Sequence, residues 1–143
     1  MKRVAIFAVM AVLLGCFVFG ICAAADRFVK NNDGTVTDTQ ASLMWADKVL
    51  NSSLTWDAAK SYCEGYSGGG KSGWRMPTID ELRQLHNSGA FGTIIQNNAG
   101  YGQVWSADEA SATAAFFNFQ TGQRGFDYKT IGKYLALPVR SGK

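Results

Sequence analysis

Cysteine and histidine are scarce in this sequence. Of its three cysteines, Cys16 and Cys22 lie in an apolar N-terminal segment, so Cys63 is the one cysteine in the rest of the sequence. The sequence has a single histidine, His86. A lone cysteine cannot form an intrachain disulfide or a multi-cysteine metal site. We therefore expect no metal and no cofactor. We expect Cys63 to be a small buried hydrophobe, with a reactive thiol or an intermolecular bridge as the alternatives.

A large excess of charge of one sign is also missing. The formal net charge is +3, from 14 Lys and Arg against 11 Asp and Glu. If Lys2 and Arg3 are removed with the N-terminal segment, 12 cations face the same 11 anions and the charge falls to +1. Such a chain carries no broad basic field, so the sequence indicates no nucleic-acid partner and no anionic membrane partner.

Residues 1–25 have the pattern of a secretory signal peptide. Lys2 and Arg3 precede a continuous apolar or small run, and Ala23 and Ala25 occupy the positions that a signal peptidase reads. Two alternatives stay open: a lipoprotein with a lipidated Cys16, or an uncleaved membrane anchor. The expected location is secreted, periplasmic or at the cell envelope. The protein would contact a membrane only through a retained or lipidated segment.

Residues 26–143 are expected to form one domain, because no repeat, charge run or long low-complexity segment divides them. The stretch 27–45 predicts short strands around a tight turn at Asn32–Gly34. It lacks carboxylates at the first and twelfth positions of a calcium loop, which favours the hairpin. The glycine-rich Ser67–Gly73 is expected to be a flexible connection between two helices.

The first of these helices is predicted over 55–66. Thr55 is a suitable N-cap, and Trp56, Ala59, Cys63 and Tyr66 recur with helical spacing on one face. That stripe predicts a face packed against the core, which agrees with a buried Cys63.

The second helix begins after the stretch "SGWRMPTIDELRQL". Thr78 and Glu81 have the spacing of a capping box, Pro77 keeps the entering chain extended, and "NSG" at 87–89 predicts the end. Met76 and Leu82 are candidates for a hydrophobic staple.

The loop before this helix carries large side chains. An isolated helix this short is unstable in water, so it needs contacts with the rest of the fold. Trp74 can supply burial there, and the guanidinium of Arg75 can bind loop carbonyls or a nearby carboxylate. A ligand contact for Arg75 is the alternative. The rest of the chain is expected to be β-rich, with strands at 103–107, on both sides of a turn at Thr121–Gly122, and at the C-terminus near Pro138.

These motifs, in this order, resemble the Lcl C-terminal domain family, the domain at the end of a bacterial collagen-like adhesin. The likeness rests on "NDGTVTDTQASLMW", "TWDAAKSYCE", "GWRMPTIDEL", "VWSA", "FNFQTG" and "LPVRSGK", spanning nearly all of residues 27–143. The family usually reads Trp-Arg-Leu-Pro, so Met76 is a departure. The resemblance marks one set of residues as the structural motif: Trp45, Trp56, Trp74, Arg75, Pro77, Thr78 and Glu81.

The central block also resembles formylglycine-generating, sulfatase-modifying proteins. This likeness implies an α+β, C-type-lectin-like fold, with two short helices packed on a small, twisted, mostly antiparallel sheet with long loops. Those enzymes need paired cysteines near the C-terminus, and residues 64–143 contain none. The expectation is therefore a binding module without catalytic residues.

The adhesin relative recognises sulfated glycosaminoglycans, which would require cations on one face. The candidate ligand-binding residues are Lys71, Arg124, Lys129 and Lys133, and scattered solubilising charges are the alternative reading. Tyr101 or Tyr128 could instead stack on neutral sugars or bind a protein.

Two other functions stay open. One is an envelope structural or assembly subunit that binds another envelope or host protein by a β edge. The other is an enzyme of unknown type using Asp80, Glu81 and His86, which the sequence disfavours because no nucleophile or metal cluster accompanies them.

Overall fold

The chain begins with the expected hairpin in the computed structural model, which describes residues 26–99 and 102–143. β1 (Phe28–Lys30) and β2 (Thr35–Asp38) pair antiparallel around a turn in which Asn32 and Gly34 have φ angles of 58° and 87°. A second hairpin joins β2 to β3 (Leu43–Ala46), and the C-terminal β9 (Val139–Ser141) pairs with β3. This four-stranded sheet has the order β1-β2-β3-β9.

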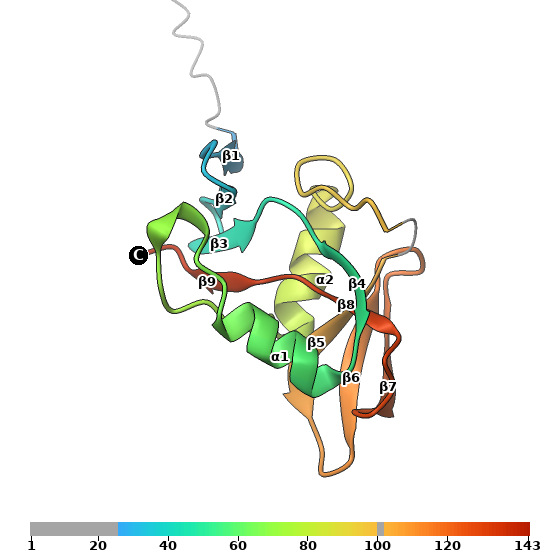
Figure 1. Cartoon of the computed structure of the whole chain (residues 1–143). Coiled ribbons are helices and arrows are strands. Elements are labelled where there is room, and N and C mark those ends of the chain that lie inside the picture. The colour runs from blue at the N-terminus through green and yellow to red at the C-terminus, as the bar shows by residue number, and fades with distance from the viewer. Residues whose placement is uncertain (1–25, 100–101) are drawn as a thin grey trace, which may run out of the picture.

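A second sheet of five strands has the order β4-β8-β5-β6-β7 (Figure 1). Its strands, in chain order, are β4 (Leu50–Leu54), β5 (Gln103–Glu109), β6 (Thr113–Asn118), β7 (Gln123–Tyr128) and β8 (Tyr134–Ala136). All its pairs are antiparallel except β5 with β8. The α+β class is confirmed, although the strands form two sheets where one was expected, and β4 was not foreseen. The C-type-lectin-like architecture stays an expectation.

Pro138 lies where the chain passes from one sheet to the other. β8 is an inner strand of the five-stranded sheet, whereas β9 is an edge strand of the four-stranded sheet. Proline lacks the N–H of a ladder donor, so it fits between two strands better than inside one. The chain therefore changes sheets at Pro138.

Helix α1 (Trp56–Glu64) follows β4 and begins as expected. The Thr55 side chain accepts a hydrogen bond from the Ala58 N–H at 3.3 Å. Trp56, Ala59 and Cys63 are buried on one face, which confirms the predicted stripe, although the helix ends before Tyr66.

Helix α2 (Ile79–Ser88) carries the capping box. The Thr78 side chain accepts from the Glu81 N–H at 3.2 Å, and Glu81 Oε1 accepts from the Thr78 N–H at 3.0 Å. The helix ends at Gly89 in the left-handed conformation, with φ 73°. Neither helix within the described residues has the length and apolar character that a bilayer span requires.

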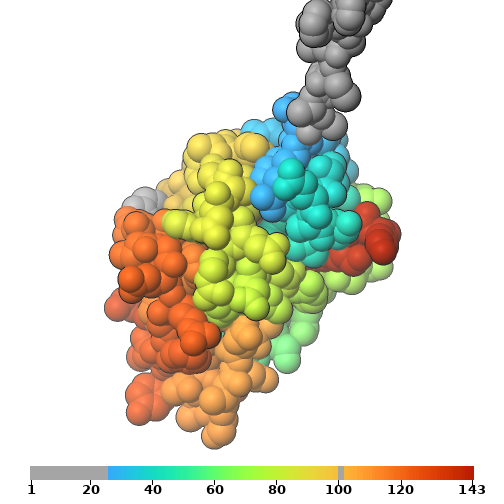
Figure 2. All heavy atoms as spheres, turned by 180° about the vertical axis from the view of Figure 1, so that it is seen from behind, coloured from blue at the N-terminus to red at the C-terminus, as the bar shows by residue number. Residues whose placement is uncertain are grey.

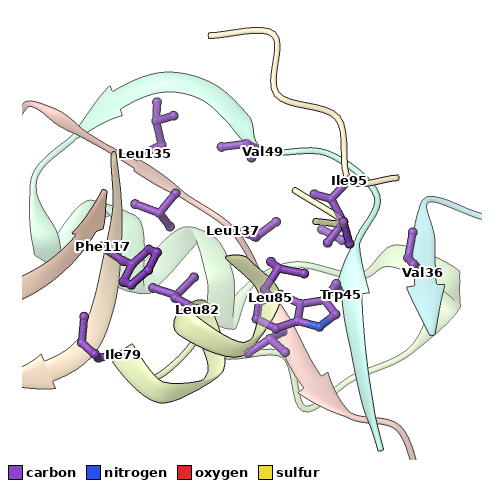
Figure 3. Close-up of a cluster of buried hydrophobic side chains, with 14 of the residues drawn as sticks. Val36, Trp45, Val49, Ile79, Leu82, Leu85, Ile95, Phe117, Leu135 and Leu137 are labelled. Carbon is purple, nitrogen blue, oxygen red and sulfur yellow. The ribbon is translucent and has the colours of Figure 1, made fainter. Parts of the chain in front are cut away.

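The two helices cover opposite faces of the five-stranded sheet. Successive residues of a strand point to opposite faces of the sheet. Val104 and Phe117 pack in the cluster that includes the α2 residues, whereas Trp105 packs in the cluster that includes the α1 residues. Figure 3 shows Phe117 next to Leu82 on the α2 side. The first cluster comprises Val36, Trp45, Ala46, Val49, Ile79, Leu82, Leu85, Ala90, Ile95, Val104, Ala115, Phe117, Leu135, Leu137 and Val139. The second comprises Trp56, Ala59, Cys63, Met76, Trp105, Ala114, Tyr134 and Ala136.

The two clusters have a consequence for the loop before α2. Met76 and Leu82 are both buried, but Met76 packs in the second cluster and Leu82 in the first, so the expected staple between them is not found. Every buried hydrophobic residue described lies between Val36 and Val139. The described core therefore extends from β2 to β9.

Candidate functional site

An open hollow lies beside the glycine-rich segment that follows α1. It has a volume of about 700 Å³ and is called here the glycine-loop hollow. Its lining comes from the β1–β2 turn, the end of α1 and the short 3₁₀ turn η1 (Gly68–Gly70). The lining residues are Asp33, Ser61, Tyr62, Gly65, Tyr66, Ser67, Gly68, Gly69 and Gly70.

Two glycines of this segment, Gly68 and Gly69, pack closely against neighbouring groups. A Cβ atom built on Gly68 would lie 2.4 Å from Cε1 of Tyr66. The Gly69 N–H donates to the Asp33 carbonyl at 3.1 Å, and the Gly69 φ of 67° favours glycine. Within the segment expected to be a flexible connection, the absence of side chains thus lets Gly68 and Gly69 approach Tyr66 and Asp33.

Tyr66 forms a fixed wall of the glycine-loop hollow. Its hydroxyl donates to the Gly34 carbonyl at 2.9 Å, and its ring meets Trp74 edge to face with centroids 4.7 Å apart. Burial, with the nearby charges of Asp47 and Asp33, raises the pKa of Tyr66 to about 12. The phenol therefore stays neutral and keeps its hydrogen bond at physiological pH.

Tyr62 and Asp33 supply the groups that a ligand could use. The half-buried Tyr62 ring lies 6.2 Å from the Tyr66 ring. Asp33 Oδ1 accepts from the Thr35 N–H and hydroxyl, which places Oδ2 near Gly69. The hollow thus combines an aromatic face with a carboxylate acceptor in a fixed orientation.

Two cations lie on or contact the segment that directly follows the lining of the glycine-loop hollow, although neither lines it. Lys71 is exposed and directly follows η1, and Arg140 Nε donates to the Ser72 carbonyl at 2.8 Å. None of the ion pairs found within 26–99 and 102–143 includes Lys71 or Arg140. Arg140 could not be identified from the sequence, because only the pairing of β9 with β3 brings it to this end of the molecule.

The other three candidate cations lie elsewhere. β7 and the glycine-rich segment occupy opposite sides of the molecule (Figure 1), and Arg124 on β7 lies 5.7 Å from the ring centre of Phe126. Lys133 is exposed, 5.9 Å from the Tyr134 ring centre. Lys129 contacts Glu109 at 2.6 Å and lies 4.7 Å from the Trp56 ring centre. The four candidates therefore do not converge on one face.

A second, smaller groove of about 320 Å³ lies between α1, the loop before α2 and β5. It is called here the paired-charge groove and is lined by Trp56, Lys60, Glu64, Arg75, Met76, Thr78, Ala107 and Glu109. In and beside it, three cations face three carboxylates: the pairs are Lys60–Glu64 at 4.0 Å, Arg75–Glu81 at 2.7 Å and Lys129–Glu109 at 2.6 Å. These charges cancel, so the groove has no net attraction for a polyanion.

The loop before α2 is held by its own side chains. Trp74 is 3% exposed, and its Nε1–H donates to the Lys71 carbonyl at 3.0 Å. Arg75 donates to both Glu81 oxygens and to the Met76 carbonyl. The carbonyl of the buried Pro77 accepts from the Ala107 N–H at 2.8 Å. Arg75 also lines the paired-charge groove with 45% of its side chain exposed, whereas Trp74 does not line it.

The remaining structural-motif tryptophans are core residues. Trp45 on β3 is 1% exposed in the first cluster and lies beside Leu85 (Figure 3). Trp56 is 5% exposed, and its Nε1–H donates to the Ser106 carbonyl at 2.8 Å. Among the sugar-stacking candidates, Tyr128 is 62% exposed on β7, whereas Tyr101 lies outside the described residues.

The three titratable side chains considered for catalysis turn to different neighbours. Asp80 pairs with Arg83, Glu81 pairs with Arg75, and His86 packs its ring against Phe117 with centroids 5.6 Å apart. Across the part of the chain that the structure describes, no group of three or more His, Cys, Asp or Glu side chains is placed to hold a metal ion.

Comparison with known families gives one match. The Lcl C-terminal domain matches residues 34–140, which include the loop before α2, Lys71, Arg140 and all of the glycine-loop hollow except Asp33. Comparison with curated proteins gives no match.

Proposed function

Since the chain belongs to the Lcl C-terminal domain family, we propose that it is an adhesin-like binding module of the cell envelope or the secreted fraction, and that it recognises glycans without catalysis. Its ligand site is the glycine-loop hollow together with Lys71 and Arg140.

One observation carries this proposal: an aromatic ring and a carboxylate line the same open hollow, and two cations lie on or contact the segment that directly follows its lining. The Tyr62 ring offers an apolar face to the C–H side of a sugar, and Asp33 Oδ2 can accept hydrogen bonds from sugar hydroxyls. Lys71 and Arg140 can donate charge-assisted hydrogen bonds to a sulfate or carboxylate on the same glycan. The ligand class is therefore an acidic glycan that contacts few cations.

A long polyanion lying along the protein is a poorer fit. The cations of the paired-charge groove are neutralised by carboxylates, and Arg124 lies far from Lys71. We therefore expect a shallow dependence of affinity on salt, because few ion pairs form on binding.

The test is a glycan array probed with residues 26–143, followed by titration of the best ligand. The double variant Lys71→Ala/Arg140→Ala should weaken binding at least about tenfold. The control Arg124→Ala/Lys133→Ala removes the same formal charge and should bind like the wild type. An array without any bound glycan, or equal losses in the two double variants, would contradict the proposal.

A second candidate is an envelope subunit that binds protein. The exposed Phe126 and Tyr128 on the edge strand β7 favour it. Recovery of one stoichiometric partner from envelope extract, with loss of that partner on Phe126→Lys, would support it over the glycan module.

The proposed location has its own test. Mass spectrometry of the protein from cell fractions should find a chain beginning at Asp26 outside the cytoplasm. A chain beginning at a lipidated Cys16, or an intact chain in the membrane, would support the alternatives.

A further inference from the structure

The edge strand β7 carries two of the three exposed large hydrophobic side chains in the described residues. Outside residues 1–25 and 100–101, the exposed large hydrophobic side chains are Val29 at 44%, Phe126 at 61% and Tyr128 at 62%. Arg124, Phe126 and Tyr128 alternate along β7 and lie on the face that α2 covers at β5 and β6. Figure 2 shows the orange strands extending to one side beyond α2, so this part of the face is uncovered.

The outer edge of β7 has unpaired backbone groups over a short segment, residues 124–126, called here the window. The Lys129 N–H donates to the Ala112 carbonyl, and antiparallel alternation then turns the backbone groups of Arg124, Phe126 and Tyr128 away from β6. The outward backbone groups of Tyr128 are already hydrogen-bonded within the chain. Its N–H donates to Asp127 Oδ1, and its carbonyl accepts from the Ile131 N–H. Arg124 and Phe126 therefore present the unpaired edge.

We propose that a second copy of this chain pairs antiparallel with this window, around a two-fold axis at Gly125. In this register Arg124 of each copy lies opposite Phe126 of the other, and the outward backbone groups of the two residues exchange hydrogen bonds. The two five-stranded sheets then form one continuous sheet across the axis.

The side chains fit a second copy of the same strand. Residues opposite each other in an antiparallel pair point to the same face, so each guanidinium meets the aromatic ring of the other copy. Arg124 already lies 5.7 Å from its own Phe126 ring centre, so a guanidinium and an aromatic ring are next to each other on this edge. Gly125 places no side chain at the axis, and a Cβ atom there would lie 2.4 Å from the Phe116 ring.

The window is short, so the dimer is expected to be weak. Sedimentation equilibrium of residues 26–143 from about 10 μM to about 1 mM should show a reversible monomer–dimer equilibrium. Phe126→Lys places a charge on the edge and should weaken dimerisation at least about tenfold. The matched control Val29→Lys, on the edge strand β1 of the other sheet, should dimerise like the wild type.

Circular dichroism of both variants shows whether the fold is retained, and Arg124→Ala provides a second, milder variant that should also weaken the dimer. A monomer at 1 mM, or equal weakening by Val29→Lys and Phe126→Lys, would overturn the inference. Dimerisation does not depend on any glycan, so the result separates this inference from the proposed ligand site.

Discussion

Arg75 and Glu81 face each other across the first turn of α2, with Nη1 2.7 Å from Oε1 and Nη2 3.0 Å from Oε2. The same Oε1 accepts the Thr78 N–H of the capping box, so one carboxylate joins the loop to the helix. The backbone of Arg75 also exchanges two hydrogen bonds with Val139, which joins the loop to β9.

We predict that Glu81→Ala lowers the free energy of unfolding by about 1–2 kcal/mol, because it removes the capping contact and a partly buried partner of Arg75. Asp80→Ala is the control: it removes a neighbouring, 81% exposed carboxylate from an ion pair and should change stability by less than about 0.5 kcal/mol. Urea unfolding measures both values. Equal losses would mean that Glu81 does not hold the loop.

Acid should destabilise the protein partly through Asp38. Its burial opposes ionisation, but hydrogen bonds from Arg27 and from the amides of Ala41 and Gln40 outweigh this and lower its pKa. A carboxyl with a lowered folded pKa stabilises the fold above its unfolded pKa of about 4, and this stabilisation is lost as pH falls through the folded value. Urea midpoints measured from pH 6 downward should therefore fall less steeply in Asp38→Asn than in the wild type. Parallel curves would contradict this prediction.

Cys63 should be inert toward thiol reagents in the folded protein. It is 0% exposed on α1, and burial raises the pKa of its thiol to about 12, with a smaller contribution from Glu64. We predict that a disulfide reagent modifies it only in urea, at least about a hundredfold more slowly in buffer than an engineered Gln84→Cys on the exposed face of α2. Equal rates in buffer would show that Cys63 is accessible.

Packing should limit substitution at Gly68, whereas backbone strain should limit it at Gly70. Gly68→Ala would bring a methyl group against the Tyr66 ring and should cost about 1–3 kcal/mol. Gly70→Ala is a control that has a strained φ of 65° but open space around it, and it should cost about 1 kcal/mol. Thermal unfolding compares the two. A smaller cost for Gly68→Ala would mean that the ring moves away freely.

Features fixed by nearby residues could be predicted from the sequence. Thr55 and Thr78 cap their helices with groups three residues away, and Gly122 turns the β6–β7 hairpin with φ 71°. These contacts need no knowledge of the rest of the fold, which explains why the element order was largely correct.

Features fixed by distant residues could not be predicted in this way. Arg140 reaches the Ser72 carbonyl across 68 positions because β9 pairs with β3. β4 lacked a strong apolar alternation, since it reads LNSSL with three exposed residues. Tyr66 was assigned to a helical stripe, whereas its position beyond the end of α1 makes it a wall of the glycine-loop hollow.

The change of sheet at Pro138 has a consequence for biosynthesis. Residues 134–141 supply the strand between β4 and β5 and also the last strand beside β3. In a nascent chain without these residues, β4 has no partner strand, and β5 and β3 each lack one of their two partner strands. Contacts between residues this far apart in sequence also form slowly. The domain therefore has to mature after its last residues have been synthesised, and a ribosome-stalled or prematurely terminated product would expose unpaired strands to chaperones and proteases.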